Sequence, residues 1–154
     1  MTIPYLGGCL CGAVRYCITA EPMTIYACHC TECQRRTGSA FALSMPVQRD
    51  AIEVLSGQPA PYRVTFADGR VKRGQFCGAC GTRLWGEPPK RPNIALVATG
   101  TLDDTSWVQP VAHVWARSAQ PWFVFPAGVP VFKTRPDDPM ELVNLWAAAR
   151  APRA

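Results

Sequence analysis

Seven of the eight cysteines in this 154-residue chain fall into three tight clusters whose spacing suits metal binding. The clusters have the patterns C-x-C, C-x-C-x-x-C and C-x-x-C, and their members are Cys9 and Cys11, then Cys28, Cys30 and Cys33, then Cys77 and Cys80. A short turn can aim neighbouring thiolates at one ion, and glycines beside the first and third clusters allow the backbone to bend. Because zinc takes thiolate ligands in tetrahedral sites, the clusters predict zinc binding.

Two other uses of these cysteines compete with zinc binding. Eight cysteines permit a disulfide framework by count, but partners two residues apart rarely reach the required Cα separation of roughly 4.4–6.8 Å. The first basic residue is Arg15, so the sequence shows no secretory signal and predicts a cytoplasmic protein, where disulfides are rare. An iron–sulfur cluster, which also uses thiolates, is the remaining alternative.

The seven clustered cysteines do not divide into two sets of four. One interpretation is a closed four-cysteine site plus an open three-cysteine site, and catalytic zinc is the kind that keeps a position open. Cys17 stands apart in an alternating run, either as a small buried residue or as an eighth ligand. From spacing alone, a single ribbon-like site also remains open, formed by Cys30, Cys33, Cys77 and Cys80.

An open zinc site with three thiolates favours particular chemistry. Its net charge is near −1, which weakens the ion as a Lewis acid and makes it a poor source of hydroxide. Binding a fourth thiol is more natural, because zinc deprotonates a coordinating thiol. The thiolate could then attack an aldehyde carbonyl, and the reverse reaction would cleave a carbon–sulfur bond.

The elements that position these residues are predicted to be mainly β-strands in a single domain spanning residues 1–154. The 15 prolines and 12 glycines argue against a helical bundle, and an Asp68-Gly69 turn indicates a hairpin. Expected strands cover residues 13–19, 24–28, 39–46, 52–55, 62–66, 70–76, 93–99 and 111–116.

Helix signals are few. One or two turns are expected at 31–37, ending at Gly38. A C-terminal helix is expected at about 139–150, where Asp138 can cap and Glu141 completes a capping-box pattern. Its predicted packing face consists of Leu142, Leu145, Trp146 and Ala149.

Charge and hydropathy exclude several classes of protein. The longest apolar stretches fall short of the ~18 residues that a membrane helix needs. The net charge of +5 is modest. A basic group lies on the predicted hairpin, but Asp68 interrupts it and its spacing matches no recognition motif, which argues against nucleic-acid binding. That group is Arg63, Arg70, Lys72 and Arg73.

The three cysteine motifs resemble a known family. The stretches 7–15 (GGCLCGAVR), 28–36 (CHCTECQRR) and 76–81 (FCGACG) are similar, in this order, to the signatures of the glutathione-dependent formaldehyde-activating enzymes, also called the centromere-protein-V-like family. The resemblance covers about residues 5–135 and leaves the C-terminal helix outside. Further matches are Gly100-Thr101-Leu102-Asp103, Pro110, His113, Ser118 and Pro121-Trp122.

The resemblance implies a zinc-binding fold of the β-tent type with two metal sites. The family pattern assigns Cys9, Cys11, Cys77 and Cys80 to a structural zinc. It assigns Cys28, Cys30 and Cys33 to a second zinc with catalytic ligands, and it leaves out Cys17.

The implied activity combines glutathione with formaldehyde to give S-hydroxymethylglutathione, formally a carbon–sulfur lyase reaction. Arg35 and Arg36 could bind the carboxylates of glutathione, although arginine pairs more often form a solvated face. His113 could line the substrate pocket, and His29 could handle a proton. The alternative for His113 is a hydrogen-bonded core histidine, and the alternative for His29 is a surface or supporting residue. The alternative function is a non-catalytic, zinc-stabilised binding module.

Overall fold

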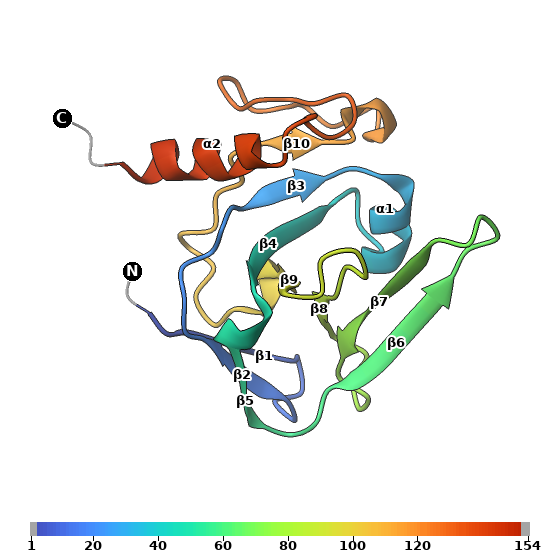
Figure 1. The fold of residues 1–154 in the computed structure, drawn as a ribbon, viewed down its shortest axis with the longest axis vertical. Helices are drawn as coiled ribbons and strands as arrows, with labels where there is room; N and C mark the ends of the chain where they lie inside the picture. Colours follow the sequence, from blue (N-terminus) through green and yellow to red (C-terminus); the bar gives the residue numbers. More distant parts are fainter. Residues whose placement is uncertain (1–2, 152–154) are drawn as a thin grey trace. The chain divides into compact units, whose positions relative to one another are not determined.

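The computed structural model describes residues 3–151 and is mainly β, as predicted (Figure 1). The chain forms two compact units, and each is assembled from two separate stretches. The first unit contains residues up to 22 and residues 45–107, and the second contains residues 23–44 and residues from 108 onward. Single-domain behaviour of the whole chain stays a prediction. No helix in the described part of the chain has the length and apolar character needed to cross a membrane.

The first unit contains a small antiparallel sheet that carries the first cysteine motif. Its strands are β1 (Tyr5–Gly8), β2 (Arg15–Ile18) and β5 (Ile52–Ser56), in the order β1-β2-β5 (Figure 1). The turn between β1 and β2 holds Cys9 and Cys11. The sequence pattern predicted strands at the positions of β2 and β5, whereas β1, which ends in two glycines, was not predicted.

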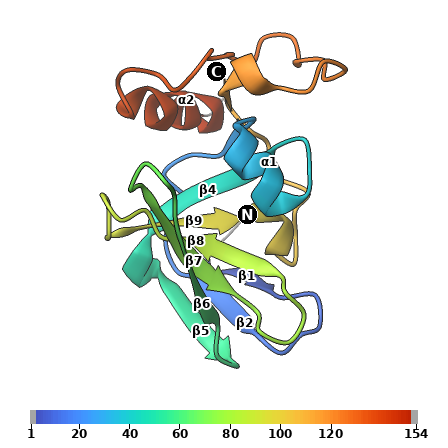
Figure 2. The same cartoon turned by 90° about the vertical axis from the view of Figure 1, so that its right-hand side faces the viewer.

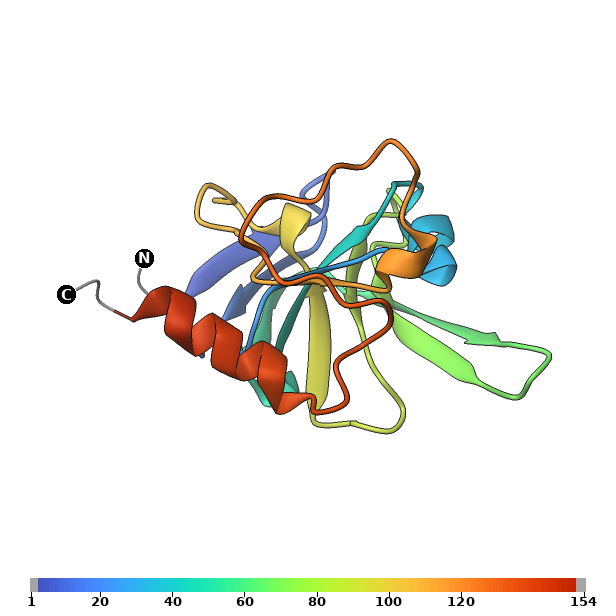
Figure 3. The same ribbon diagram turned by 90° about the horizontal axis from the view of Figure 1, so that it is seen from above.

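The same unit contains four further antiparallel strands in the order β9-β8-β7-β6. The strands β6 (Ala60–Thr65) and β7 (Val71–Phe76) form the predicted hairpin, which extends as a long two-stranded ribbon (Figure 3). Next come β8 (Arg83–Gly86) and β9 (Ile94–Ala98). The third cysteine motif occupies the turn between β7 and β8, so both of the motifs in this unit lie on strand-connecting turns.

The core of the first unit is built around two buried aromatic side chains. Tyr16 and Trp85 meet edge to face with ring centroids 5.7 Å apart, and both are almost fully buried. Each polar atom has a partner: the Tyr16 hydroxyl bonds the Thr101 hydroxyl at 2.7 Å, and the Trp85 indole N–H donates to Glu87. Aromatic pairs of this kind stabilise a core when their polar ends are paired.

The second unit is built on a three-stranded arrangement that carries the second cysteine motif. Its order is β10-β3-β4, with β10 (His113–Val114) parallel to β3 (Tyr26–Cys28) and β4 (Ala42–Gln48) antiparallel to β3. Strand β4 runs from the second unit into the first. The helices of the second unit are α1 (Thr31–Thr37) and α2 (Met140–Arg150) (Figure 2).

Helix α2 confirms the predicted C-terminal helix and its cap. The Asp138 carboxylate accepts the backbone N–H of Met140 at 2.8 Å, which satisfies one of the unpaired amides at the helix start. Trp146 is buried, whereas Ala149 is exposed, so the packing face is narrower than predicted. The buried hydroxyl of Thr24 donates to the carbonyl of Leu142 at 2.8 Å and fastens the helix within its unit.

Candidate metal centres

The first unit brings four cysteine sulfurs into one set. The Sγ atoms of Cys9, Cys11, Cys77 and Cys80 all lie within 4.8 Å of one another. The Cys9–Cys11 and Cys11–Cys77 sulfur distances are 3.5 and 3.9 Å. A tetrahedron with zinc–sulfur bonds of about 2.3 Å has edges of about 3.8 Å, so the spacing fits a tetrahedral ion. This set is referred to below as the closed set.

Two similar turns position the closed set. In the first, the N–H of Gly12 donates to the carbonyl of Cys9, and the N–H of Val14 donates to the Cys9 sulfur at 3.2 Å. In the second, the N–H of Gly81 donates to the carbonyl of Cys77 at 2.8 Å. Both glycines have a positive φ, 77° and 74°, a conformation that other residues adopt at a cost. The glycines therefore allow each turn to present two sulfurs together.

Thr82 links the two turns of the closed set, and the cysteine spacing alone did not reveal it. Its hydroxyl lies 3.1 Å from the Cys80 sulfur and accepts the backbone N–H of Leu10 at 3.2 Å. The hydroxyl and the backbone N–H of Thr82 lower the pKa of Cys80 to about 5. A lowered pKa favours the thiolate, which is the form that binds a metal ion.

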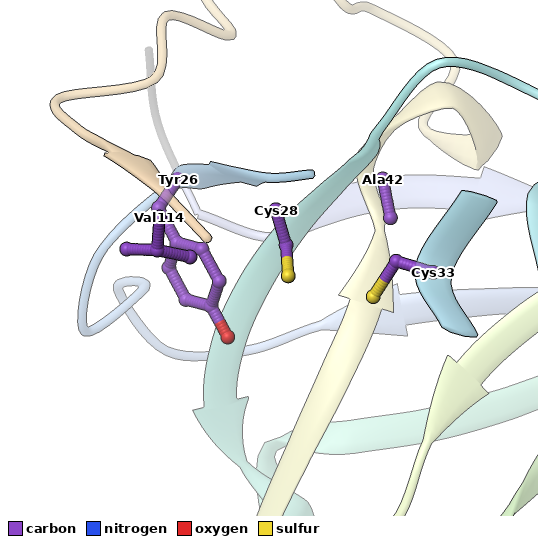
Figure 4. Packing of buried hydrophobic residues seen from close by; sticks show 5 residues of the cluster. All are labelled: Tyr26, Cys28, Cys33, Ala42 and Val114. Carbon is purple, nitrogen blue, oxygen red and sulfur yellow. The ribbon is translucent and has the colours of Figure 1, made fainter. Parts of the chain in front are cut away.

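The second unit brings three sulfurs together in what we call the open set. The Sγ atoms of Cys28, Cys30 and Cys33 lie within 4.8 Å of one another, and within residues 3–151 no fourth cysteine, histidine or carboxylate joins them. Cys28 and Cys33 belong to a buried cluster with Tyr26, Ala42 and Val114, and their sulfur atoms point to the same side (Figure 4).

The three sulfurs of the open set are so close that their thiolate forms would repel one another without a bound cation. The neighbouring thiols of Cys30 and Cys33, together with burial, raise the pKa of Cys28 above its ordinary value. Three adjacent thiolates repel one another unless a positive ion neutralises them, and zinc-type ions bind the thiolate form. The donor set therefore fits a divalent metal and leaves one tetrahedral position for another ligand.

Helix α1 fixes the open set. Cys30 is its N-cap residue, and the Cys30 sulfur accepts the backbone N–H of Cys33 at 3.3 Å. The helix ends at Gly38, as predicted. Of the two predicted substrate-binding arginines, Arg36 directs its guanidinium at the Cys33 sulfur, 3.9 Å away, whereas Arg35 is exposed.

The structure places His113 beside His29, on the strand face opposite to Val114. Val114 packs with Cys28, and because side chains alternate along a strand, His113 lies on the opposite face. There, His29 Nε2 and His113 Nδ1 are 2.9 Å apart, and both rings are buried. The rings that surround the histidine pair belong to Phe41, Phe123 and Phe125.

The aromatic surroundings keep the histidine pair neutral. Burial, and then the neighbouring His113, lower the pKa of His29 to about 4, and burial lowers the pKa of His113. One nitrogen of each ring takes part in the hydrogen bond between the two rings. The other nitrogens, His29 Nδ1 and His113 Nε2, are buried without a partner. The interpretation of His113 as a hydrogen-bonded core histidine agrees with this placement.

Replacing the two histidines singly and together is expected to give non-additive losses of stability. His29→Phe leaves His113 Nδ1 buried and unpaired, which costs about 1–3 kcal/mol, and His113→Phe has the converse effect. The double variant removes both polar rings from an aromatic environment, so its loss should fall below the sum by about 1 kcal/mol or more. Urea unfolding of the metal-loaded proteins measures this, and strictly additive losses would contradict it.

All eight cysteines are free, which removes the disulfide alternative. Cys17 is buried, and its sulfur lies 3.8 Å from a Glu53 carboxylate oxygen, outside both sets. Burial raises its pKa, so Cys17 is a buried thiol rather than an eighth ligand. The ribbon-like set of Cys30, Cys33, Cys77 and Cys80 does not form within the described chain.

Comparison with known proteins agrees with this site. The model of the family described as glutathione-dependent formaldehyde-activating enzyme matches residues 4–118, which include both sulfur sets. A crystal structure of a Rhodobacter sphaeroides protein is similar to this chain, with a TM-score of 0.52 and 20% sequence identity. The similarity covers 82% of this chain and 98% of that protein, and it shows a shared fold.

Proposed function

The chain belongs to the glutathione-dependent formaldehyde-activating enzyme family, and on that premise we propose that it is a zinc-dependent carbon–sulfur lyase-type enzyme. Its substrates would be a small thiol such as glutathione and a small aldehyde, with formaldehyde as the aldehyde that the family description suggests. The proposal includes a cytoplasmic location, where such thiols are kept reduced.

In this proposal, the closed set holds a structural zinc ion. Four thiolates complete a tetrahedron and leave no position for a substrate. Cys9 and Cys77 are buried, and the two turns of the set are far apart in the sequence, since Cys11 and Cys77 are separated by 66 positions. Metal binding there would contribute directly to the stability of the first unit.

The open set holds the second zinc and carries the chemistry. A zinc ion held by Cys28, Cys30 and Cys33 would supply one open position in which an incoming thiol is kept as its thiolate. In the overall reaction, the sulfur of the thiol forms a bond to the aldehyde carbon while the carbon–oxygen double bond becomes single. The carbonyl oxygen takes up the proton that the thiol has lost, and the reverse reaction breaks the carbon–sulfur bond.

The chain's own side chains support these steps by holding charge and position. Arg36 is directed at the Cys33 sulfur, so its positive charge offsets the negative charge that a set of thiolates accumulates. Arg35 is exposed on α1 and is available to the carboxylates of a bound thiol. His113 faces the phenylalanine rings, so we assign it no contact with the substrate.

The single observation that carries this proposal is the presence of three convergent sulfurs without a fourth protein ligand in the described chain. A purely structural zinc site would be closed by a fourth side chain. The geometry of the open set therefore favours an enzyme over the alternative, a zinc-stabilised binding module.

Cobalt substitution is expected to reveal thiol binding directly. Glutathione should intensify the sulfur-to-cobalt charge-transfer absorption of one of two cobalt ions, as its coordination rises from three sulfurs to four. S-methylglutathione has the same skeleton without an ionisable thiol, so it should leave the spectrum unchanged. If glutathione also leaves the spectrum unchanged, the proposed function is wrong and the binding-module alternative takes its place.

A further inference from the structure

Trp115 stands beside the open set in an uncommon backbone conformation. Its side chain packs against the buried cluster that contains Cys28 and Cys33. Among the described residues it is the one non-glycine residue with a positive φ, 59°. Such left-handed conformations cost free energy and persist where surrounding contacts enforce them, often at functional sites. The second unit therefore holds this tryptophan in place against local strain.

Side-chain hydrogen bonds hold the turn that follows Trp115. The side-chain amide of Gln34 donates to the backbone carbonyls of His29 and Ser118, each at 2.7 Å. The Ser118 hydroxyl lies 3.1 Å from the carbonyls of both His29 and Trp115 and can donate to either. Because His29 separates two of the sulfur ligands, these bonds fix the turn η3 (Ala116–Ser118) relative to the open set.

Arg117, in the middle of this turn, presents a cation that no carboxylate of the described residues neutralises. Its guanidinium carbon lies 4.8 Å from the centroid of the Trp115 ring, and the residue is exposed. Within residues 3–151, Arg117 forms no ion pair with a carboxylate. A guanidinium held on an aromatic face is positioned in advance and can bind a carboxylate through two hydrogen bonds.

A cation near the open set would compensate the negative charge of a metal ion bound by thiolates. A divalent ion with three thiolates has a net charge of −1, and a fourth thiolate makes it −2. A thiol that also carries carboxylates is repelled by that charge unless a cation near the site compensates. Arg36 is already directed at the Cys33 sulfur, whereas Arg117 stacks on Trp115, which packs against the cluster that contains Cys28 and Cys33.

We propose that the open site selects thiols bearing a carboxylate several bonds from the sulfur, and that Arg117, stacked on Trp115, binds this carboxylate. The inference rests on the proposed function, because it assumes that a thiol enters the open site. It makes Arg117 a specificity-determining residue that the three cysteine motifs do not contain.

The test compares glutathione with its diethyl ester, which keeps the thiol and the skeleton but lacks both carboxylates. Affinities are measured by titrating the cobalt-loaded protein. The wild type should bind glutathione about tenfold more tightly than the ester. Arg117→Ala should lose most of this preference through weaker glutathione binding, with its affinity for the ester unchanged, and any remainder is due to Arg35, which is exposed on α1. The matched control is Arg150→Ala, which removes the other arginine stacked on a tryptophan in the same unit and should keep the preference.

Each outcome bears on a separate claim. A wild type that binds both thiols equally, or an Arg117→Ala variant that keeps the preference, overturns the inference alone. Equal weakening of both thiols by Arg117→Ala also overturns it, because that result indicates a role in packing rather than in carboxylate binding. If neither thiol binds the wild type, the proposed function fails and the inference fails with it.

Discussion

Cys77→Ser is expected to remove the metal from the closed set and to destabilise the protein by about 4 kcal/mol or more. The buried Cys77 sulfur is one of the four sulfurs of the closed set, and the remaining three thiols would crowd one another without an ion to neutralise them. Structural zinc contributes about 10–16 kcal/mol to the folding of small zinc peptides. Even a third of that contribution is a large share of the ~5–15 kcal/mol that stabilises a typical domain.

Metal analysis and urea unfolding measure this effect. The wild type should contain two equivalents of metal and Cys77→Ser one. The control is Cys17→Ser, which also replaces a buried cysteine but leaves both sulfur sets complete. That control should retain both metal equivalents. A Cys77→Ser protein as stable as Cys17→Ser would show that the closed set has no structural role.

Cys30→Ser is expected to abolish thiol binding at the open set with little loss of stability. Cys30 caps α1, and a serine hydroxyl can accept the backbone N–H of Cys33 as the sulfur does. The substitution therefore keeps the start of the helix but removes one of three thiolates. With two sulfurs left, we expect the affinity of this set for metal to fall at least about 100-fold, which corresponds to roughly 2.7 kcal/mol.

The same cobalt titration reports the result and contains its own control. Glutathione should no longer change the spectrum of Cys30→Ser, while the absorption of the four-sulfur ion in the first unit should persist. Unfolding midpoints close to those of the wild type would confirm that the fold is retained. Undiminished glutathione binding by Cys30→Ser would place the thiol elsewhere in the protein.

Local sequence patterns predicted those parts of the structure that local chemistry determines. The cysteine spacings identified all seven cysteines of the two sets. Their division into four and three depended on the family resemblance, because spacing alone also allowed Cys30 and Cys33 to join Cys77 and Cys80. Gly38 and Asp138 correctly marked the end of α1 and the start of α2, because neighbouring residues determine where a helix begins and ends.

Features that depend on distant parts of the chain were not predictable. His29 and His113 are 84 positions apart, and only the parallel pairing of β3 with β10 brings their rings together. Strands β1 and β8 were missed because each ends in glycine and is only four residues long. Their extended conformation is fixed by pairing with neighbours rather than by side-chain preference.

Because each unit is assembled from two separate stretches of the chain, the two sulfur sets become complete at different times during synthesis. A chain emerging from the ribosome presents Cys28, Cys30 and Cys33 within six residues, so the open set is complete almost as soon as it appears. The closed set must wait until Cys77 and Cys80 have been synthesised and a loop of more than 60 residues has closed. During biosynthesis, metal could therefore reach the sulfurs of the open set before those of the closed set, although three ligands would hold it less firmly than four.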